Sequence, residues 1–511
     1  MKAYLMHREQ DFDLQRALPP NTEALVQDLE LDTLYDAMAR DDPFLFDIAA
    51  KAVLSSLNDP AAIVYRQYVL ADCLEQSSVV REIYAIAVEA IQGEKRGFWG
   101  LLSSSSPSTI LSRSVEVLQF FVGMLKRLRR IADEYAGSFR SEGFGRFFAM
   151  LAGELDDEYF QVVEGHLREL KFRRGVLISA ELGKGNKGTR YVLRRPPPEQ
   201  SWMERLGFGE RSGYSFQIAE RDEAGFTALS ELRGRGINLV ANALAQSTDH
   251  ILSFFSMVRA ELAFYIGCLN LYGQLTEQGE PTCFPAPLAA GTRALSAQGL
   301  YDVCLALQLE ARVVGNDLNA DNKSLVMITG ANQGGKSTFL RGVGLAQLMM
   351  QCGMFVAAES FRADVCAGIF THYKREEDAA MESGKLDEEL SRMSDIADTI
   401  CPDCLVLCNE SFAATNEREG SEIARQVIRA LVESNVKVVF VTHLFDLAHG
   451  FYRAEMGTAL FLRAERQADG RRTFKLVEGE PLPTSYGEDT YRRIFGPARD
   501  AVPAAHADMR R

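Results

Sequence analysis

The chain lacks several features that mark whole classes of protein. Its nine cysteines are scattered and odd in number, so a disulfide scaffold is not expected. No stretch reaches about 18 uncharged apolar residues, the length that a membrane-spanning helix needs. Residues 1–9 already carry charges before any apolar run of signal-peptide length. We therefore expect a soluble cytoplasmic protein without membrane contact.

A positive net charge is also missing. The 70 acidic residues outnumber the 56 Lys and Arg, which gives a net charge of −14 over 511 residues and excludes a chain coated in positive charge. A basic surface can still be local. Hydrophobic residues make up 47% and charged residues 25%, which excludes wholesale disorder. At roughly 100–200 residues per domain, we expect about two to four domains.

Hydrophobic periodicity divides the chain into segments. Residues 1–165 predict a helical core domain, and residues 236–300 continue it with long helices whose apolar residues alternate steps of four and three. Residues 301–498 alternate strand candidates with helical segments, which is typical of an α/β domain. Residues 499–511 are interpreted as a flexible tail. The predicted fold class is therefore multidomain, an all-α part followed by an α/β domain.

Residues 166–235 interrupt the helical pattern as a basic, β-rich insertion. Two strand candidates, at 176–180 and 190–193, flank a glycine-rich turn and predict a hairpin. Residues 214–218 are a candidate third strand. Over residues 166–212 there are eleven Lys and Arg against five Glu, a local charge of +6. Such a hairpin can contact nucleic-acid phosphates without reading sequence, although a solvated hairpin without a ligand explains the same pattern.

A glycine-rich loop carries the sharpest chemical signal. Gly330, Gly335, Lys336 and Ser337 fit G-x-x-x-x-G-K-[ST], between an apolar run and a helical segment. Loop amides and a helix N-terminus bind phosphate oxygens, the lysine reaches the β- and γ-phosphates, and the serine ligates Mg²⁺. The sequence thus predicts ATP and Mg²⁺ at nine residues: Gly330, Ala331, Asn332, Gln333, Gly334, Gly335, Lys336, Ser337 and Thr338.

Two polar residues follow the next predicted strands. Glu410 comes after the apolar strand 405–408 and is the candidate to polarise an attacking water. His443 ends the strand 438–442 and is the candidate sensor of the γ-phosphate. A solvated carboxylate at a strand end and a structural histidine are the alternatives.

The run from residue 325 to 445 resembles the ATPase domain of MutS-type DNA mismatch-repair proteins. Residues 328–338 are similar to the family's I-T-G-P-N-M-G-G-K-S-T loop. Further segments match the family in the same order, namely 369–371, 405–407 and 441–445. Weaker likeness to the family's core and lever domains lies at 65–67, 260–262 and 313–319.

The resemblance implies a core and lever domain with a clamp-like insertion, followed by an ABC-type P-loop ATPase domain. In such a domain nucleotide is sandwiched between two subunits, so it also implies a homodimer in which Ser383 and Gly384 contact the partner's γ-phosphate. Asn409 would share the metal with Ser337. The clamp position implies DNA contacts from the basic insertion, for which the candidates are Arg173, Arg174, Lys184, Lys187 and Arg190.

The chain departs from the family pattern at four places. Asn409 replaces the Walker-B aspartate, Glu359 stands where a Gln is usual, and Val313 stands where an aromatic residue often stacks on adenine. Nothing near the N-terminus resembles the mismatch-reading domain, and the letters Phe208-Gly209-Glu210 are interpreted as a coincidence. Weaker Mg²⁺ binding is expected at Asn409 because an amide oxygen lacks the charge of a carboxylate.

The resulting hypothesis is a MutS-like ATPase of DNA mismatch repair or recombination control, in which ATP binding closes a dimer around DNA and hydrolysis opens it. One alternative is an ATPase that remodels ribosomes or another ribonucleoprotein complex. Another is a nucleotide-gated scaffold that binds ATP without turnover. Cys401 and Cys404 have C-x-x-C form but no second pair at zinc spacing, which favours structural cysteines.

Overall fold

The structure is a computed structural model that describes residues 1–98, 106–173, 175–195, 214–215, 217–309, 312–375, 384–467 and 471–483. The chain forms two compact units. The helical unit comprises Met1–Phe12 and Glu75–Leu262, and the sheet unit comprises Asp13–Leu74 and Ala263–Arg511. Residues 13–74 therefore cluster with the α/β part, although their helical pattern resembles that of their neighbours in sequence.

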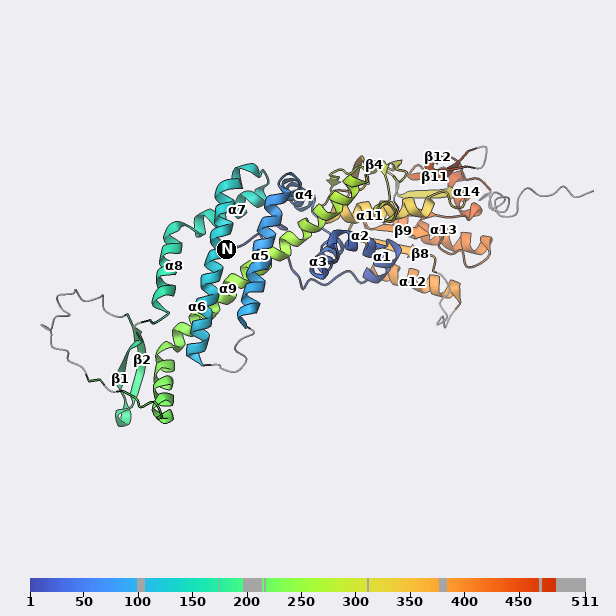
Figure 1. The fold of residues 1–511 in the computed structure, drawn as a ribbon. Helices are drawn as coiled ribbons and strands as arrows, with labels where there is room; N and C mark the ends of the chain where they lie inside the picture. Colours follow the sequence, from blue (N-terminus) through green and yellow to red (C-terminus); the bar gives the residue numbers. More distant parts are fainter. Residues whose placement is uncertain are drawn as a thin grey trace, which may run out of the picture. The chain divides into compact units, whose positions relative to one another are not determined.

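Long helices build the helical unit (Figure 1). They are α5 (Ser77–Phe98), α6 (Pro107–Tyr135), α7 (Glu142–Glu154), α8 (Asp157–Glu169) and the first part of α9 (Glu223–Glu277), with a short 3-10 turn at Ala136–Ser138. Helices α5 and α6 lie side by side. The rings of Phe121 on α6 and Phe255 on α9 are 5.6 Å apart, in a core of apolar side chains. These helices share one apolar core.

Glu261 on α9 is fully buried and holds the N-terminal residues of the helical unit. Its carboxylate accepts hydrogen bonds from the backbone N–H groups of Leu5 at 2.6 Å, Met6 at 3.2 Å and Phe12 at 3.2 Å. Burial raises the pKa of Glu261 to about 7, although these three N–H groups favour the charged form and oppose the shift.

Helix α9 contains an 18-residue window of mean hydropathy 1.4, long and apolar enough by composition to cross a membrane. Of that window, 67% is buried inside the protein. Arg259 and Glu261 interrupt the apolar run, so a search for uncharged stretches does not find it. A buried core helix passes the same test of length and composition.

A two-stranded hairpin, β1 (Leu177–Leu182) and β2 (Gly188–Arg194), forms where the sequence predicts it. Figure 1 shows the hairpin beside the start of α9. There Ile178 packs so close to Gly236 that a Cβ on the glycine would lie 2.4 Å from its side chain. The predicted third strand at 214–218 was wrong for its described residues 214, 215, 217 and 218, which form no strand. Sequence alternation alone does not supply the partner that a strand needs.

A six-stranded sheet is the centre of the sheet unit, with strand order β12-β11-β6-β10-β9-β8. Its strands are β6 (Leu325–Gly330), β8 (Ile369–Tyr373), β9 (Leu405–Asn409), β10 (Lys437–Val441), β11 (Ala459–Arg466) and β12 (Arg472–Glu478). All neighbours pair parallel except β11 and β12. The carboxyl ends of β6, β9 and β10 therefore meet at one edge, where parallel sheets usually bind ligands.

The other helices are α1 (Thr22–Asp28), α2 (Leu31–Ala39), α3 (Pro43–Leu54), α4 (Pro60–Glu75), α10 (Val303–Gln308), α11 (Lys336–Gln351), α12 (Lys385–Thr399), α13 (Glu417–Glu433) and α14 (Phe445–Arg453). Of these, α1, α11, α12, α13 and α14 contact the six-stranded sheet (Figure 1). The strands β6, β9 and β10 are almost fully buried, as expected for parallel strands covered on both faces. The observed fold is helix-rich and multidomain with mixed sheets, as the sequence predicts at this level.

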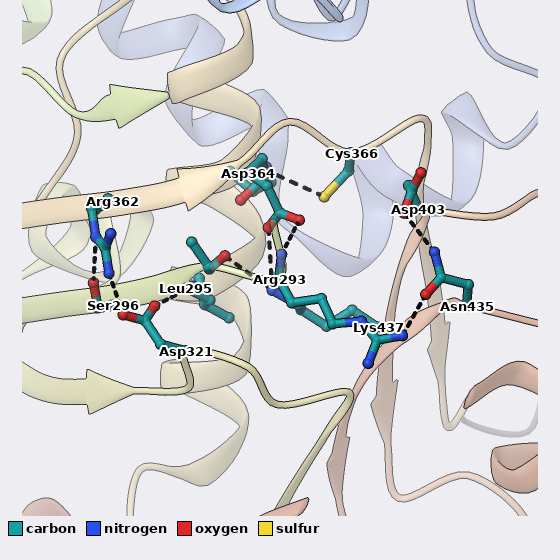
Figure 2. Close-up of polar contacts among 12 residues, drawn as sticks. Arg293, Leu295, Ser296, Asp321, Arg362, Asp364, Cys366, Asp403, Asn435 and Lys437 are labelled. Carbon is teal, nitrogen blue, oxygen red and sulfur yellow. Dashed lines mark hydrogen bonds and ion pairs between the residues drawn. The ribbon is translucent and has the colours of Figure 1, made fainter. Parts of the chain in front are cut away.

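A second, four-stranded sheet joins the first through polar side chains. Its order is β3-β7-β4-β5, with strands β3 (Ala286–Leu288), β4 (Leu295–Leu300), β5 (Asn316–Asn319) and β7 (Ser360–Asp364). Figure 2 shows the junction, where the Lys437 ammonium at the start of β10 lies 3.2 Å from the Asp364 carboxylate at the end of β7. The guanidinium of Arg293 donates to the Asn435 side chain at 2.6 Å, and Asn435 in turn donates to Asp403 at 2.7 Å. We call these five residues the basal network.

Candidate functional site

The glycine-rich loop lies between β6 and α11, at the carboxyl edge of the six-stranded sheet. Gly330 has a φ of 107° and Gly335 a φ of 86°, conformations that L side chains rarely adopt. A Cβ on Gly334 would lie 2.6 Å from the Ala464 side chain of β11. Glycine is therefore required both by the turn and by the close approach of β11.

Lys336 begins α11 and is only 5% exposed. Its ammonium donates to the carbonyl oxygens of Gly330 at 3.1 Å and Ala331 at 3.0 Å, so it folds back over the loop. Burial lowers the pKa of Lys336; the negative charge of Glu410 opposes this shift and the positive charge of Arg472 adds to it. A phosphate group at the loop would compensate this costly buried charge.

Ser337 and Asn409 meet across the edge between α11 and β9. The Ser337 hydroxyl donates to the Asn409 side-chain oxygen at 2.9 Å. Both offer uncharged oxygen atoms, the ligand type that Mg²⁺ accepts when it retains waters and phosphate oxygens. Within the described ranges, no cluster of three His, Cys, Asp or Glu residues offers an alternative metal site. The two residues therefore fit a weakly held Mg²⁺ that arrives with a phosphate ligand.

Glu410 and His443 stand at the ends of neighbouring strands. The Glu410 carboxylate lies 3.9 Å from Nδ1 of His443, and both side chains are partly exposed. The backbone N–H of Glu410 donates to the carbonyl of Val441 at 2.9 Å, which fixes the strand ends together. Glu410 has a φ of 55°, an unusual conformation for a non-glycine residue. The sequence-predicted carboxylate, histidine and lysine thus lie at one edge.

A cavity of about 340 Å³ adjoins the loop. Its lining is mostly apolar and includes Val313, Phe339 and Phe474, while its polar side chains include those of Asp302, Arg312, Asn316, Gln333 and Thr338. Phe474 is an aromatic residue that the sequence reasoning missed. The Asn316 side chain donates to the Phe474 carbonyl at 3.1 Å and accepts the Leu476 N–H at 2.7 Å, holding Phe474 at a φ of 61°.

Arg472 is a second missed residue, at the start of β12. Its Nε donates to the carbonyl of Asn332 at 3.3 Å, so a second cation stands beside the loop. More than 130 residues separate it from the loop in the sequence, and no local motif announces it. Arg472 could have been found only by predicting that β11 pairs with β6 and that β12 pairs with β11.

Other sequence-predicted positions divide between described and undescribed residues. Gly384 is the N-cap of α12, while Ser383 lies outside the described residues. Glu359 does not reach the loop and lines a different cavity, of about 820 Å³, on the four-stranded sheet. On α12, Leu390 is exposed although it is apolar, and Glu389 is buried although it is acidic.

The basic hairpin presents its charges to solvent. Arg173, Lys184 and Lys187 are exposed, and Arg174 lies outside the described residues. Arg190 is exposed too but forms an ion pair of 3.2 Å with Glu181, so a negative charge lies directly beside its guanidinium. Lys184 and Lys187 flank the turn of the hairpin and are the stronger candidates for contacts with phosphate.

Comparison with known proteins gives two family matches. A family described as "MutS2 N-terminal domain" matches residues 58–278, and one described as "MutS domain V" matches residues 326–508. The latter match includes the loop, Asn409, Glu410 and His443. Together the two matches cover most of the chain without overlap.

Individual relatives match over part of the chain. "DNA mismatch repair protein MutS" of Thermus aquaticus is 31% identical over 62% of this chain and 38% of its own length. "MutS protein homolog 4" of Mus musculus is 25% identical over 47% of this chain and 25% of its own length. "DNA mismatch repair protein MutS" of Syntrophomonas wolfei subsp. wolfei is 37% identical over 27% of this chain and 16% of its own length. The chain thus spans about a sixth to two fifths of these relatives.

Proposed function

Because the chain belongs to the MutS family, we propose that its sheet unit binds and hydrolyses ATP with Mg²⁺ and that this cycle controls how the protein holds DNA. The carrying observation is that Lys336, Ser337, Asn409 and Glu410 gather at one sheet edge beside a glycine-rich loop. The proposed role is in DNA mismatch repair or recombination control, and the name "DNA mismatch repair protein MutS" carried by relatives of this chain supports the first of these.

The nucleotide would bind with its phosphates on the loop and its base in the 340 Å³ cavity. Backbone N–H groups at the start of α11 would face phosphate oxygens, and Lys336 would exchange its loop carbonyls for the β- and γ-phosphates. In the cavity, Phe474 offers an aromatic face to the base, a role that Val313 cannot fill.

Hydrolysis needs a base and charge compensation. Glu410 would accept a proton from the attacking water, and His443, 3.9 Å from that carboxylate, would sense the γ-phosphate. Ser337 and Asn409 would hold Mg²⁺, which offsets phosphate charge when bound. Since both ligands are uncharged, the site should need more free Mg²⁺ than one with a carboxylate at position 409.

The proposed assembly is a homodimer with a composite nucleotide site. This rests on the resemblance, which puts residues 383 and 384 opposite the partner's γ-phosphate. It is supported by Gly384, the N-cap of the 15-residue helix α12, which has no side-chain cap of its own. The uncapped N–H groups of such a helix favour an anion.

DNA would bind at the basic hairpin through its backbone phosphates. Lys184 and Lys187 are exposed at the turn, and contacts of this kind carry no sequence information. We therefore expect similar affinity for matched and single-mismatch duplexes, a preference for branched or bent DNA, and weaker binding as salt increases. A cytoplasmic location belongs to the same proposal.

A competition experiment tests the nucleic-acid part. Matched duplex, single-mismatch duplex, branched DNA and structured RNA would compete at fixed salt for the protein. The double variant Lys184→Glu/Lys187→Glu should lose most binding and keep ATPase activity measured without DNA. Its control is Lys95→Glu/Arg96→Glu on α5, an equal charge change at exposed positions of the same unit. Equal loss in both variants, or a mismatch preference above about tenfold, 1.4 kcal/mol, contradicts the proposal.

A scaffold that binds ATP without turnover is the second candidate, favoured by the neutral Asn409 at the metal position. Steady-state phosphate release separates the two. An ATPase should release phosphate at a rate that Glu410→Gln lowers by a factor on the order of 100. A scaffold would bind ATP and release no more phosphate than this variant.

A further inference from the structure

His372 has one hydrogen-bond partner on helix α12 and another next to Glu410, the candidate catalytic carboxylate. It sits on β8, is fully buried, and its Nε2 is 2.9 Å from the backbone carbonyl of Glu389 on α12. Its Nδ1 is 2.7 Å from the hydroxyl of Ser411, which follows Glu410 directly in the chain. One imidazole therefore connects α12 to the segment that carries Glu410.

The hydrogen-bond roles of this imidazole follow from its partners. A backbone carbonyl only accepts, so Nε2 must carry the hydrogen that points at Glu389. Burial and the nearby Arg392 lower the pKa of His372 to about 4, so the ring is neutral at pH 7 and Nδ1 is an acceptor. The Ser411 hydroxyl then donates to Nδ1, with the His372 carbonyl, also 2.7 Å away, as its alternative acceptor.

Further contacts join the same two elements. The ring of Phe412 stacks on the His372 ring with centroids 5.4 Å apart. Arg392 of α12 donates to the carbonyl of Tyr373 at the end of β8, at 2.9 Å. The Glu389 carboxyl group is buried, which raises its pKa, while the backbone N–H groups of Phe412 and Ala414 lie near enough to oppose that shift. Helix α12 and residues 410–414 are thus in contact through buried polar groups.

The segment that these contacts hold has a strained backbone. Glu410 and Phe412 have φ values of 55° and 62°, which non-glycine residues adopt only when their surroundings impose them. Gly420 of α13 allows this path, because a Cβ there would lie 2.3 Å from the Phe412 carbonyl oxygen. Without a partner at His372, the segment would be expected to relax and carry Glu410 away from its position.

We propose that His372 is a positioning residue for ATP hydrolysis, which holds Glu410 in place by linking Ser411 to helix α12. It follows that turnover depends on the position of α12, so a ligand or partner that moves this helix would control hydrolysis. ATP binding would not depend on it, because the loop and the 340 Å³ cavity are built from other residues. The inference rests on the proposed function, in which Glu410 activates the water.

The test compares two conservative variants. Ser411→Ala removes one hydroxyl, and His372→Phe keeps the ring against Phe412 but removes both hydrogen bonds. We expect kcat to fall about tenfold in Ser411→Ala and between tenfold and a hundredfold in His372→Phe, since a displacement near 1 Å costs rate of this order. The affinity for a non-hydrolysable ATP analogue should remain within twofold. The double variant should resemble His372→Phe, because both substitutions break one linkage.

Two further variants serve as controls. Ser421→Ala removes another buried hydroxyl, for which the described residues provide no hydrogen-bond partner, and should leave kcat unchanged. His372→Gln can restore the hydrogen bond to the Glu389 carbonyl and should recover part of the lost rate. Thermal unfolding of every variant separates a loss of folded protein from a loss of kcat per folded molecule.

The outcomes distinguish the role of His372 from the proposed role of Glu410. If Glu410→Gln hydrolyses ATP at the parental rate, the proposed role of Glu410 fails. If Glu410→Gln is inactive while folded Ser411→Ala and His372→Phe keep the parental kcat, the positioning role of His372 is overturned. A parallel loss of ATP affinity and kcat in both variants would also overturn it, since that result indicates a general disturbance of the nucleotide site.

Discussion

The two edges of the six-stranded sheet both carry buried or half-buried lysines, but only one edge satisfies them with side-chain partners. At the amino edge, Lys437 of the basal network lies 3.2 Å from Asp364 and also donates to the Ala294 carbonyl at 3.0 Å. At the carboxyl edge, the described residues give the Lys336 ammonium only loop carbonyls as hydrogen-bond acceptors, and burial lowers its pKa.

This difference distinguishes a buried charge that stabilises the fold from a buried charge that binds a ligand. A buried charge that is paired in the folded protein is maintained by its own neighbours, and its removal disturbs them. A buried charge without a counter-charge is costly to the fold and is explained by what it binds. The comparison therefore assigns folding to the amino edge and chemistry to the carboxyl edge.

The largest expected effect is on ATP binding at the carboxyl edge. Lys336→Met should reduce ATP affinity on the order of a thousandfold, about 4 kcal/mol, because it removes a charge-assisted contact with phosphate in a confined loop. The variant should unfold at no lower urea concentration than the parent, since the lost charge was unfavourable in the folded state. Calorimetric titration with ATP measures the first result, and unchanged affinity contradicts the assignment of the loop.

The matched substitution at the amino edge should have the opposite profile. Lys437→Met leaves the Asp364 carboxylate without its cation, and we expect the free energy of unfolding to fall by about 3 kcal/mol. ATP affinity should stay within twofold, because no residue of the basal network lines the nucleotide cavity. Urea unfolding and the same titration measure both. If Lys437→Met is as stable as the parent but binds ATP more weakly, the assignment of folding to the amino edge is wrong.

A third buried ionisable group, Glu261, accepts hydrogen bonds from backbone N–H groups alone among the described residues and should make stability depend on pH. Its folded pKa of about 7 exceeds an unfolded value near 4.5, so the folded state binds an extra proton between these values. Stability should therefore fall by up to about 1.4 kcal/mol per pH unit from pH 4.5 to 7, and remain low above that. Glu261→Gln should lack this decline; parallel curves of unfolding free energy against pH would contradict the assignment.

The smallest effect concerns the metal. Asn409→Asp places a carboxylate where the Ser337 hydroxyl now meets an amide oxygen, and should lower the Mg²⁺ concentration for half-maximal hydrolysis several-fold. The matched control, Asn319→Asp, changes an exposed asparagine of β5 that does not line the nucleotide cavity and should leave the Mg²⁺ dependence unchanged. An identical Mg²⁺ dependence in Asn409→Asp and the parent would show that position 409 does not contact the metal.

Local sequence patterns predicted the parts of the site that follow strands directly. The loop after β6 carries its glycines and lysine in one continuous motif, and Glu410 and His443 follow apolar strands. These residues come together because β6, β10 and β9 are parallel neighbours. The helix-rich fold and the basic hairpin were also predicted from periodicity and turn residues.

The remaining parts depend on pairing between distant segments, which periodicity does not encode. Arg472 and Phe474 reach the loop only because β11 pairs with β6 and β12 pairs with β11. His372 contacts Ser411 because β8 lies next to β9. On α12 the apolar Leu390 is exposed, whereas Glu389, whose carbonyl contacts His372, is buried.

The burial of the cysteines gives the protein a native attachment point for a spectroscopic probe. All nine are free thiols, and Cys401 is the exposed one. Burial raises the pKa of Cys352 and Cys408 to about 12 and that of Cys283 and Cys404 to about 11, which keeps these thiols protonated and slow to alkylate. A maleimide dye should therefore label Cys401 first. It lies just before β9, at the edge opposite the glycine-rich loop, where a fluorophore would not obstruct the nucleotide.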